Sequence, residues 1–96
     1  MKPSQALNQH RQAIRQIVMS HRACNARVFG SVLHGEDQEG SDLDLLVEPT
    51  SETSLMDIAK IQHQLQQLLG VSVDVLTPNA LPDSFREKVL LEALPV

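Results

Sequence analysis

The chain has 96 residues, of which 42% are hydrophobic and 21% are charged, and its formal net charge at pH 7 is −4. This length favours one small domain over residues 1–96 and excludes a separate substrate-binding domain. Two aromatic residues and a negative net charge disfavour direct nucleic-acid binding, which normally needs a basic surface and stacking platforms. With a single cysteine, Cys24, and no spanning apolar run or signal-peptide pattern, we expect a cytoplasmic protein without membrane contact.

The first half of the chain is predicted to contain one helix and two strands. Apolar residues at helical spacing predict a helix that Ser4 caps and that ends near His21. A short apolar strand follows over residues 26–29 and stops at Gly30, with a short helical turn after it. Residues 42–48 (DLDLLVE) have the alternating pattern of a second strand.

The second half is predicted to contain two helices around a third strand. Ser54 begins a capping box for a strongly amphipathic helix that ends at Gly70. Residues 71–76 (VSVDVL) alternate as a strand, and Asp83 or Ser84 opens the last helix. The predicted order is therefore α-β-β-α-β-α.

The two alternating strands have an apolar side and an acidic side. Because successive side chains of a strand point to opposite faces, Asp42 and Asp44 share one face of the second strand, and Asp74 lies on the corresponding face of the third. Helices can cover only the apolar side, which predicts a two-layer α/β domain whose second sheet face is open. The apolar positions are Leu43, Leu45, Val47, Val71, Val73 and Val75.

Charge is distributed unevenly along the chain. Residues 1–27 carry basic side chains and no acidic one, whereas residues 28–59 carry acidic side chains and no basic one. Two solvated faces that attract each other explain most of these residues. The acidic residues are Glu36, Asp37, Glu39, Asp42, Asp44, Glu48, Glu52 and Asp57.

If the second and third strands are neighbours, Asp42, Asp44 and Asp74 converge on the open face. Two carboxylates about 4 to 6 Å apart repel each other by a few kcal/mol at an effective dielectric near 20. A shared proton or a cation would relieve this repulsion, and Mg²⁺ prefers oxygen ligands that include phosphates and water. The alternative is that these aspartates are merely solvent-facing residues of half-exposed strands.

A turn next to the aspartates has the composition of a phosphate-binding loop. Gly30 and Ser31 end the first strand just ahead of the acidic strand. Glycine lets a ligand approach the backbone closely, so N–H groups and a hydroxyl could hold phosphate there. On its own, Gly-Ser is also a common turn dipeptide.

Together these residues resemble a known signature. Gly30-Ser31, Gly35, the run Ser41-Asp42-Leu43-Asp44-Leu45 and the segment Val73-Asp74-Val75 are similar to the motif of the DNA polymerase β-like nucleotidyltransferase superfamily. More narrowly, the chain resembles the minimal nucleotidyltransferases (MNT) of prokaryotes from about residue 26 to its last residue. The resemblance implies a mixed β-sheet with helices on one face and an open active-site face. It also implies transfer of a nucleoside monophosphate, AMP from ATP, to a hydroxyl group.

The resemblance also assigns roles to individual residues. Asp42, Asp44 and Asp74 would be the catalytic residues and the ligands of two Mg²⁺ ions, which Mn²⁺ can replace, with Asp74 also able to activate the acceptor. The nucleotide would be bound by Gly30, Ser31, His34 and Ser41. Two metal ions can stabilise the attacking and leaving oxygens of an in-line displacement.

One position departs from the family pattern. Many members have Ala-Arg where this chain has Leu33-His34. Arginine is a permanent cation with a planar donor fork, whereas a histidine is charged only in its protonated form. The departure lowers the expected affinity for phosphate and leaves the aspartates unchanged.

The partner is implied by the resemblance alone. MNT proteins act as antitoxins beside an HEPN-type toxin and add AMP to a tyrosine of that partner. One alternative is a binding module that neutralises a partner by contact without catalysis. Another is transfer to a small molecule, which would need an added domain or a pocket built by a dimer. The acceptor, the choice between ATP and other nucleoside triphosphates, and the oligomeric state, including a homo-oligomer, stay open.

Overall fold

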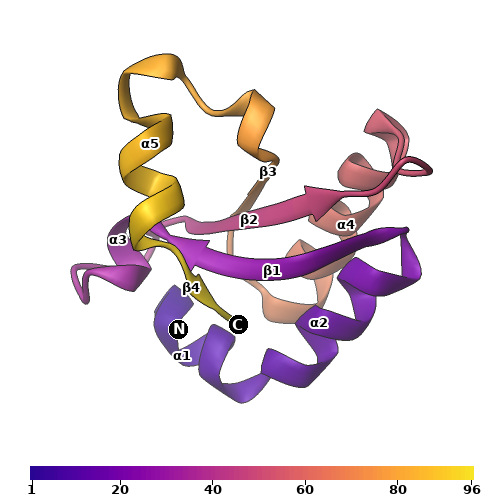
Figure 1. The fold of residues 1–96 in the computed structure, drawn as a ribbon. Coiled ribbons are helices and arrows are strands. Elements are labelled where there is room, and N and C mark those ends of the chain that lie inside the picture. The colour runs from indigo at the N-terminus through magenta and orange to yellow at the C-terminus, as the bar shows by residue number, and fades with distance from the viewer.

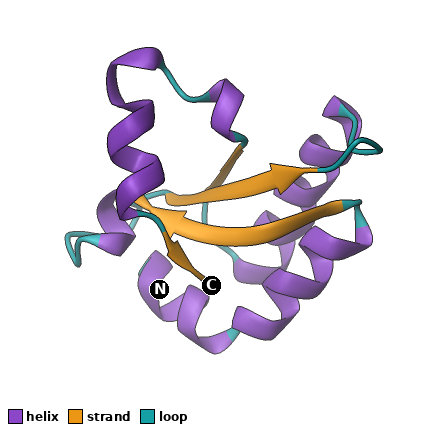
Figure 2. Ribbon diagram, in the orientation of Figure 1, coloured by secondary structure: helices purple, strands orange, loops and turns teal.

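A four-stranded β-sheet organises the chain (Figure 1, Figure 2). The computed structural model describes residues 1–96. The strand order is β3-β2-β1-β4; β1 is antiparallel to both β2 and β4, while β2 and β3 are parallel, so the sheet is mixed as expected. The strands are β1 (Ala23–Phe29), β2 (Leu43–Pro49), β3 (Val73–Leu76) and β4 (Leu94–Pro95).

Helices lie on both sides of this sheet. The helices α1, α2 and α4 cover one face, and α5 with a 3₁₀ turn, η1, stands over part of the other (Figure 1). None of the five α-helices has the length and apolar composition of a membrane span. They are α1 (Pro3–Gln9), α2 (Arg11–Ser20), α3 (Gly30–Leu33), α4 (Leu55–Leu69) and α5 (Asp83–Glu92), and η1 is Pro78–Ala80.

The larger core lies between the sheet and α1, α2 and α4. Leu43, Leu45 and Val47 of β2 are fully buried in it, which confirms the predicted alternation. Helix α4 begins at the predicted capping box of Ser54 and ends at Gly70, whose φ of +69° suits glycine. These apolar side chains leave the aspartates of β2 and β3 on the opposite face.

The second face carries a smaller core that the sequence analysis did not foresee. Phe29, Leu46, Leu81 and Val89 pack together there. Leu46 lies on the same side of β2 as Asp44 because the two are separated by two positions. Helix α5 therefore covers the end of this face beyond Asp44, and the predicted open face is restricted to the neighbourhood of the aspartates.

Arg86 holds α5 in this place. Its guanidinium donates hydrogen bonds to the carbonyl oxygens of Pro78 and Leu81, at 2.8 and 2.7 Å, and pairs with Asp83 at 2.6 Å. A planar group with several donors can tie the preceding turn to the helix in this way. The connection between η1 and α5 is consequently fixed at the side of the sheet that carries the aspartates.

Several predicted boundaries were wrong near the start of the chain. The single predicted helix is two helices, because the backbone at His10 leaves the helical region at φ −130° and ψ 24°. Lys2 rather than Ser4 occupies the N-cap, since Pro3 takes the first helical position that suits proline. Strand β1 begins three residues earlier than residue 26, with an irregular register near Asn25. Strand β4 was not predicted, because two residues carry no detectable period.

Strand β3 is an edge strand whose outward donors are satisfied by a helix. Val73 and Val75 donate their N–H groups to the side-chain oxygens of Gln66 and Gln62, which lie one turn apart on α4. Unpaired edge donors otherwise invite pairing with another chain. These bonds also fix the position of β3, and hence of Asp74, against α4.

Candidate active site

The aspartates of β2 and β3 lie side by side on the second sheet face. Asp44 and Asp74 are directly paired in the parallel register of the two strands. Neighbouring strands are about 4.8 Å apart, so carboxylates on one face at such a pair are close neighbours. Asp42 lies one residue before β2 begins and is exposed. The structure thus brings the predicted aspartates to one region.

The carboxylates repel one another, and this repulsion contributes to the pKa of Asp44. Its pKa is raised from the ordinary 3.8 to about 6, first by burial and then by the negative charges of Asp74 and Asp42. None of the three carboxylates takes part in an ion pair or a side-chain hydrogen bond. The site therefore has negative charge that nothing in the chain neutralises.

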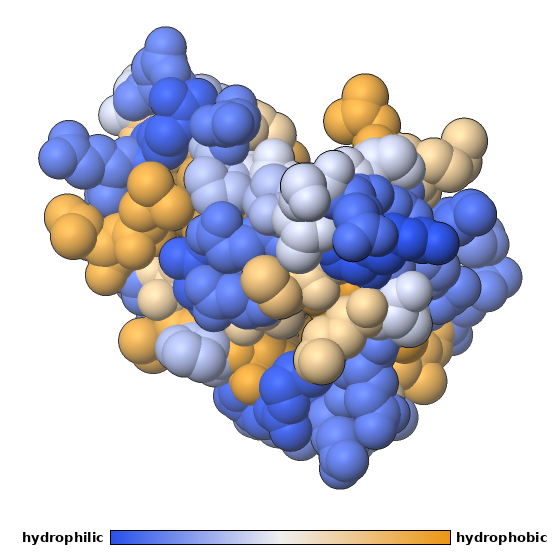
Figure 3. All heavy atoms as spheres, turned by 45° about the vertical axis from the view of Figure 1, so that its right-hand side comes forward, coloured by the Kyte–Doolittle hydropathy of each residue, from blue (hydrophilic) through white to orange (hydrophobic).

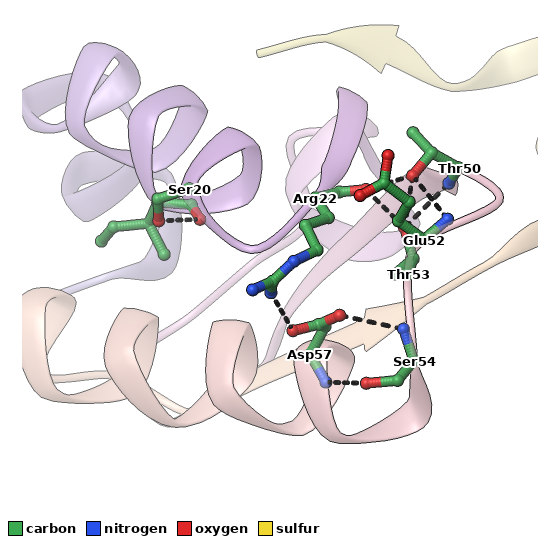
Figure 4. Close-up of polar contacts among 8 residues, drawn as sticks. Ser20, Arg22, Thr50, Glu52, Thr53, Ser54 and Asp57 are labelled. Atoms are coloured by element: carbon green, nitrogen blue, oxygen red, sulfur yellow. Dashed lines mark hydrogen bonds and ion pairs between the residues drawn. The ribbon is translucent and has the colours of Figure 1, made fainter.

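Other acidic residues of the same sequence run have structural partners. Asp57 accepts the N–H of Ser54 and pairs with Arg22, both at 2.9 Å, at the start of α4 (Figure 4). Asp37 accepts the N–H of Ser4 in the first turn of α1 at 2.9 Å. These hydrogen bonds from backbone groups hold the pKa of each carboxyl below its usual value. The solvated-face interpretation is too simple for both, because each is buried and accepts a backbone N–H at the start of a helix.

Gly30 leaves room for the Asp44 carboxylate. A Cβ atom at position 30 would lie 2.3 Å from Oδ2 of Asp44, far inside contact distance. The backbone also adopts φ +74° there, which L side chains rarely tolerate. Sequence reasoning attributed Gly30 to the approach of phosphate, and the structure adds that the glycine makes room for a site carboxylate.

The other predicted nucleotide contacts differ in their surroundings. Ser31 is in the first turn of the four-residue helix α3, half-exposed. His34 follows α3, and its Nε2 lies 3.1 Å from Oε2 of Glu92 at the end of α5. The hydroxyl of Ser41 accepts the N–H of Gln38 at 2.9 Å and closes the turn before β2. His34 is thus beside the site, and Ser41 shapes the loop that carries Asp42.

A cleft of about 450 Å³ opens between Asp44 and α5. This volume falls within the range of roughly 300 to 1,000 Å³ that is usual for small-molecule sites. The surface is hollowed beside the lobe of α5 and η1 at the upper left, so α5 stands out from the sheet (Figure 3). The lining consists of Phe29, Gly30, His34, Asp44, Leu76, Phe85, Lys88, Val89 and Glu92.

Sequence reasoning missed the contribution of α5 to this cleft. Phe85, Lys88 and Glu92 are spaced so that they lie along one face of the helix. That spacing was available in the sequence, but nothing in it indicated that this face would stand opposite Asp44. The cleft joins residues from β1, α3, β2, β3 and α5.

The donor chemistry of the aspartates suits Mg²⁺. Carboxylate oxygens are its preferred ligands, and a cation would offset the burial and the repulsion that together raise the pKa of Asp44. No three acidic, histidine or cysteine side chains are arranged as a complete metal cage. Mg²⁺ needs no such cage, because it typically uses one or two carboxylates together with water and substrate phosphates. Asp42, Asp44 and Asp74 therefore fit the ion as partial ligands.

Comparisons with known proteins identify the family of the chain. A family model described as Nucleotidyltransferase domain matches residues 7–96. MJ0435 of Methanocaldococcus jannaschii, described as a candidate protein adenylyltransferase, is 36% identical over 90 residues that cover 94% of this chain and 97% of that protein. Protein adenylyltransferase MntA of Thermococcus cleftensis is 36% identical over 67 residues that cover 70% of this chain and 68% of the relative.

Solved structures share the fold. A candidate minimal nucleotidyltransferase has a TM-score of 0.86 at 42% identity, covering 97% of this chain and 95% of that one. A toxin-antitoxin structure with AMP-PNP has a TM-score of 0.73 at 16% identity, covering 88% of this chain and 69% of that one, and this likeness concerns the fold alone. The predicted resemblance to the minimal nucleotidyltransferases is thereby confirmed. The chain belongs to the nucleotidyltransferase domain family.

Proposed function

We propose that the chain transfers AMP from ATP to a hydroxyl group of a partner protein and acts as an antitoxin. The proposal rests on one observation. The carboxylates around Asp44 have no partner that neutralises their charge, and they lie beside Gly30 and the cleft. The names of two relatives, both described as protein adenylyltransferases, support AMP as the transferred group. Each is 36% identical to this chain.

Asp42, Asp44 and Asp74 would hold two Mg²⁺ ions, and Mn²⁺ can take their place. When bound, these ions supply positive charge that stabilises the negative charge developing on the phosphates. The backbone after Gly30 and the hydroxyl of Ser31 would bind the polyphosphate at the same end of the cleft. Ser41 would act by holding the loop that presents Asp42.

The transfer itself is a displacement at the α-phosphorus of ATP. The acceptor oxygen forms a bond to that phosphorus while the bond to the β-phosphate oxygen breaks, which yields an AMP ester and pyrophosphate. Asp74 is exposed and has no ion-pair partner, so it is free to take the proton of the acceptor hydroxyl. Correct placement of the two reactants supplies most of the remaining acceleration.

The proposed partner is an HEPN-type toxin, modified on a tyrosine. The similar folds solved as toxin-antitoxin structures, one with AMP-PNP and one as MntA with HepT, support a toxin and a nucleotide as ligands. The open surface around Asp74 leaves space for an acceptor carried by another chain. A cytoplasmic location is part of the proposal, since the reaction consumes ATP.

The test is to incubate the protein with such a toxin, Mg²⁺ and ATP and to measure the intact mass of both chains. We expect the toxin to gain the mass of one AMP unit with the antitoxin present at substoichiometric amounts. An antitoxin that works by contact needs at least one copy for each toxin and leaves no adduct. Neutralisation at one-to-one stoichiometry without a mass change would replace the enzyme proposal by this alternative.

One observation favours the alternative of neutralisation by contact. His34 stands where many family members have arginine, and here it is paired with Glu92. A weaker cation that is already engaged offers less attraction to phosphate. The mass measurement above decides between the two functions.

The double variant Asp42→Asn, Asp44→Asn tests the site directly. Loss of two carboxylates should abolish Mg²⁺-dependent ATP binding and lower transfer at least about 10³-fold, because electrostatic stabilisation of the phosphates is lost. The variant should remain folded, since neither carboxylate makes a structural bond. Calorimetry with and without Mg²⁺ measures the effect. Binding of equal strength in the variant would contradict the assignment.

A further inference from the structure

The two aromatic residues of the chain have opposite environments. Phe29 is buried in the smaller core of the second face, whereas Phe85 is 42% exposed. Phe85 lines the cleft near the start of α5. An exposed ring at the wall of an apolar pocket offers a face on which a nucleobase can stack.

Lys88 is a cation without a partner on the same wall. It takes part in no ion pair and no hydrogen bond, while the neighbouring acidic residue Glu92 is engaged with His34. Lys88 and Asp44 both line the cleft, and no ion pair joins them. The lysine and the carboxylate therefore both face the same cavity.

The order of these residues along α5 divides the cleft into two ends. Phe85 and Glu92 are seven positions apart, which is about 10 Å along a helix. The Glu92 end adjoins His34, and the Phe85 end lies where α5 begins. Lys88 lies between them, one turn from Phe85. One end of the cleft is thus apolar and the other polar, as an elongated ligand with an aromatic ring and a charged chain requires.

We propose that α5 is the nucleotide-recognition wall of this protein, with Phe85 stacking on the base and Lys88 binding the polyphosphate of ATP. The inference deepens the proposed function and rests on it. Lysine binds phosphate as a mobile point charge, so an unpaired lysine suits a flexible polyphosphate. Stacking on Phe85 tolerates any base, so Phe85 contributes affinity for the nucleoside part without selecting adenine.

The experiment compares ATP with inorganic tripolyphosphate, each titrated in the presence of Mg²⁺ by calorimetry. Phe85→Ala should weaken ATP binding roughly tenfold and leave tripolyphosphate binding unchanged, since only ATP has a base to stack. Lys88→Gln should weaken both ligands about tenfold, because a charge-assisted contact to phosphate is lost. Phe85→Trp should retain ATP binding.

Two matched variants control for charge and for loss of apolar surface. Lys60→Gln removes an exposed lysine of α4 that does not line the cleft, and Leu91→Ala removes a side chain of α5 that is 82% exposed and points elsewhere. Both should bind ATP and tripolyphosphate like the wild type. Thermal unfolding of all variants reports whether the fold is retained.

The outcomes separate this inference from the proposed function. Wild-type-like ATP binding by Phe85→Ala and Lys88→Gln, in a protein that still modifies its partner, overturns the role of α5 and leaves the proposed function standing. An equal loss in Lys60→Gln also overturns it, because the effect would then be one of net charge. If the wild type binds no nucleoside triphosphate with Mg²⁺, the proposed function and the inference both fail.

Discussion

Asp57 and Asp44 show two opposite uses of the same side chain. At the start of α4, Asp57 receives a backbone N–H from Ser54 and the guanidinium of Arg22, so its pKa is lowered. On β2, Asp44 receives neither; burial first, and then two neighbouring negative charges, raise its pKa to about 6. Carboxylates with partners hold the fold together, whereas a carboxylate without them, with a raised pKa and in a cleft, is typical of a functional site.

The same contrast applies to acidic residues of the β1–β2 loop and of β2. Asp37 is buried and accepts the N–H of Ser4, and Glu48 pairs with Arg27 across the sheet. One run in the sequence therefore contains acidic residues of two kinds. Asp37 and Glu48 have partners in the first part of the chain and are structural, whereas Asp42 and Asp44 have none and lie close to Asp74 of β3.

Among single substitutions, the largest effect on transfer is expected at Gly30, which makes room for the Asp44 carboxylate. Gly30→Ala would force Asp44 to move, since its Cβ would lie 2.3 Å from Oδ2, and displacement of a site group by about 1 Å can lower transfer about 10²-fold. Gly35→Ala is the matched control, because Gly35 has a similar φ of +70° and no atom within 4 Å of the added Cβ. Both variants should lose about 1 to 2 kcal/mol of stability from the left-handed backbone. Equal transfer rates in the two would show that Asp44 does not depend on Gly30.

Replacing Asp44 and Asp57 by asparagine should change the stability of the protein in opposite directions. Asp44→Asn should raise the free energy of unfolding at about pH 7 by about 1 kcal/mol after allowance for solvent screening, or roughly 4 to 8 °C in Tm. Asp57→Asn should lower Tm, because it removes the acceptor of Ser54 and the partner of Arg22. Thermal unfolding followed by circular dichroism measures both. A destabilised Asp44→Asn would mean that Asp44 has a structural partner.

The pH dependence of these two variants differs as well. Because the folded state of Asp44 binds its proton more tightly than the unfolded state, its contribution to stability falls as pH rises from about 4 to about 6 and stays constant above. The advantage of Asp44→Asn should therefore vanish near pH 4. The contribution of Asp57 has the opposite sign: it is present above the ordinary carboxyl pKa and is lost as pH falls through the lowered value.

The smallest effect concerns the ion pair at the cleft. Glu92→Gln should release His34 for phosphate and tighten ATP binding by up to about fivefold, since a half-exposed pair contributes about 0 to 1 kcal/mol. Glu87→Gln on the same helix removes an exposed charge that pairs with nothing and should change binding less. Calorimetry in low salt measures both. Weaker binding by Glu92→Gln would indicate that Glu92 orients His34 toward the nucleotide.

Much of the fold could be predicted because its signals are local. The alternation in residues 42–48, the capping box at Ser54 and the helix stop at Gly70 each depend on residues within one or two turns. The break at His10 was missed, and so was the second core around Leu46, which depends on side chains from distant parts of the chain. Asp37 likewise accepts a hydrogen bond from the first turn of α1 from 33 positions away.

The sequence by itself determined the family and the face of the sheet that carries the site, since motif spacing and a period of two are properties of the chain alone. Only the tertiary structure decided which acidic residues are neutralised and where the cleft lies. Arg22 reaches Asp57 over 35 positions and His34 reaches Glu92 over 58. Local sequence patterns do not predict such long-range contacts, because the contacts form only when separate elements pack against one sheet.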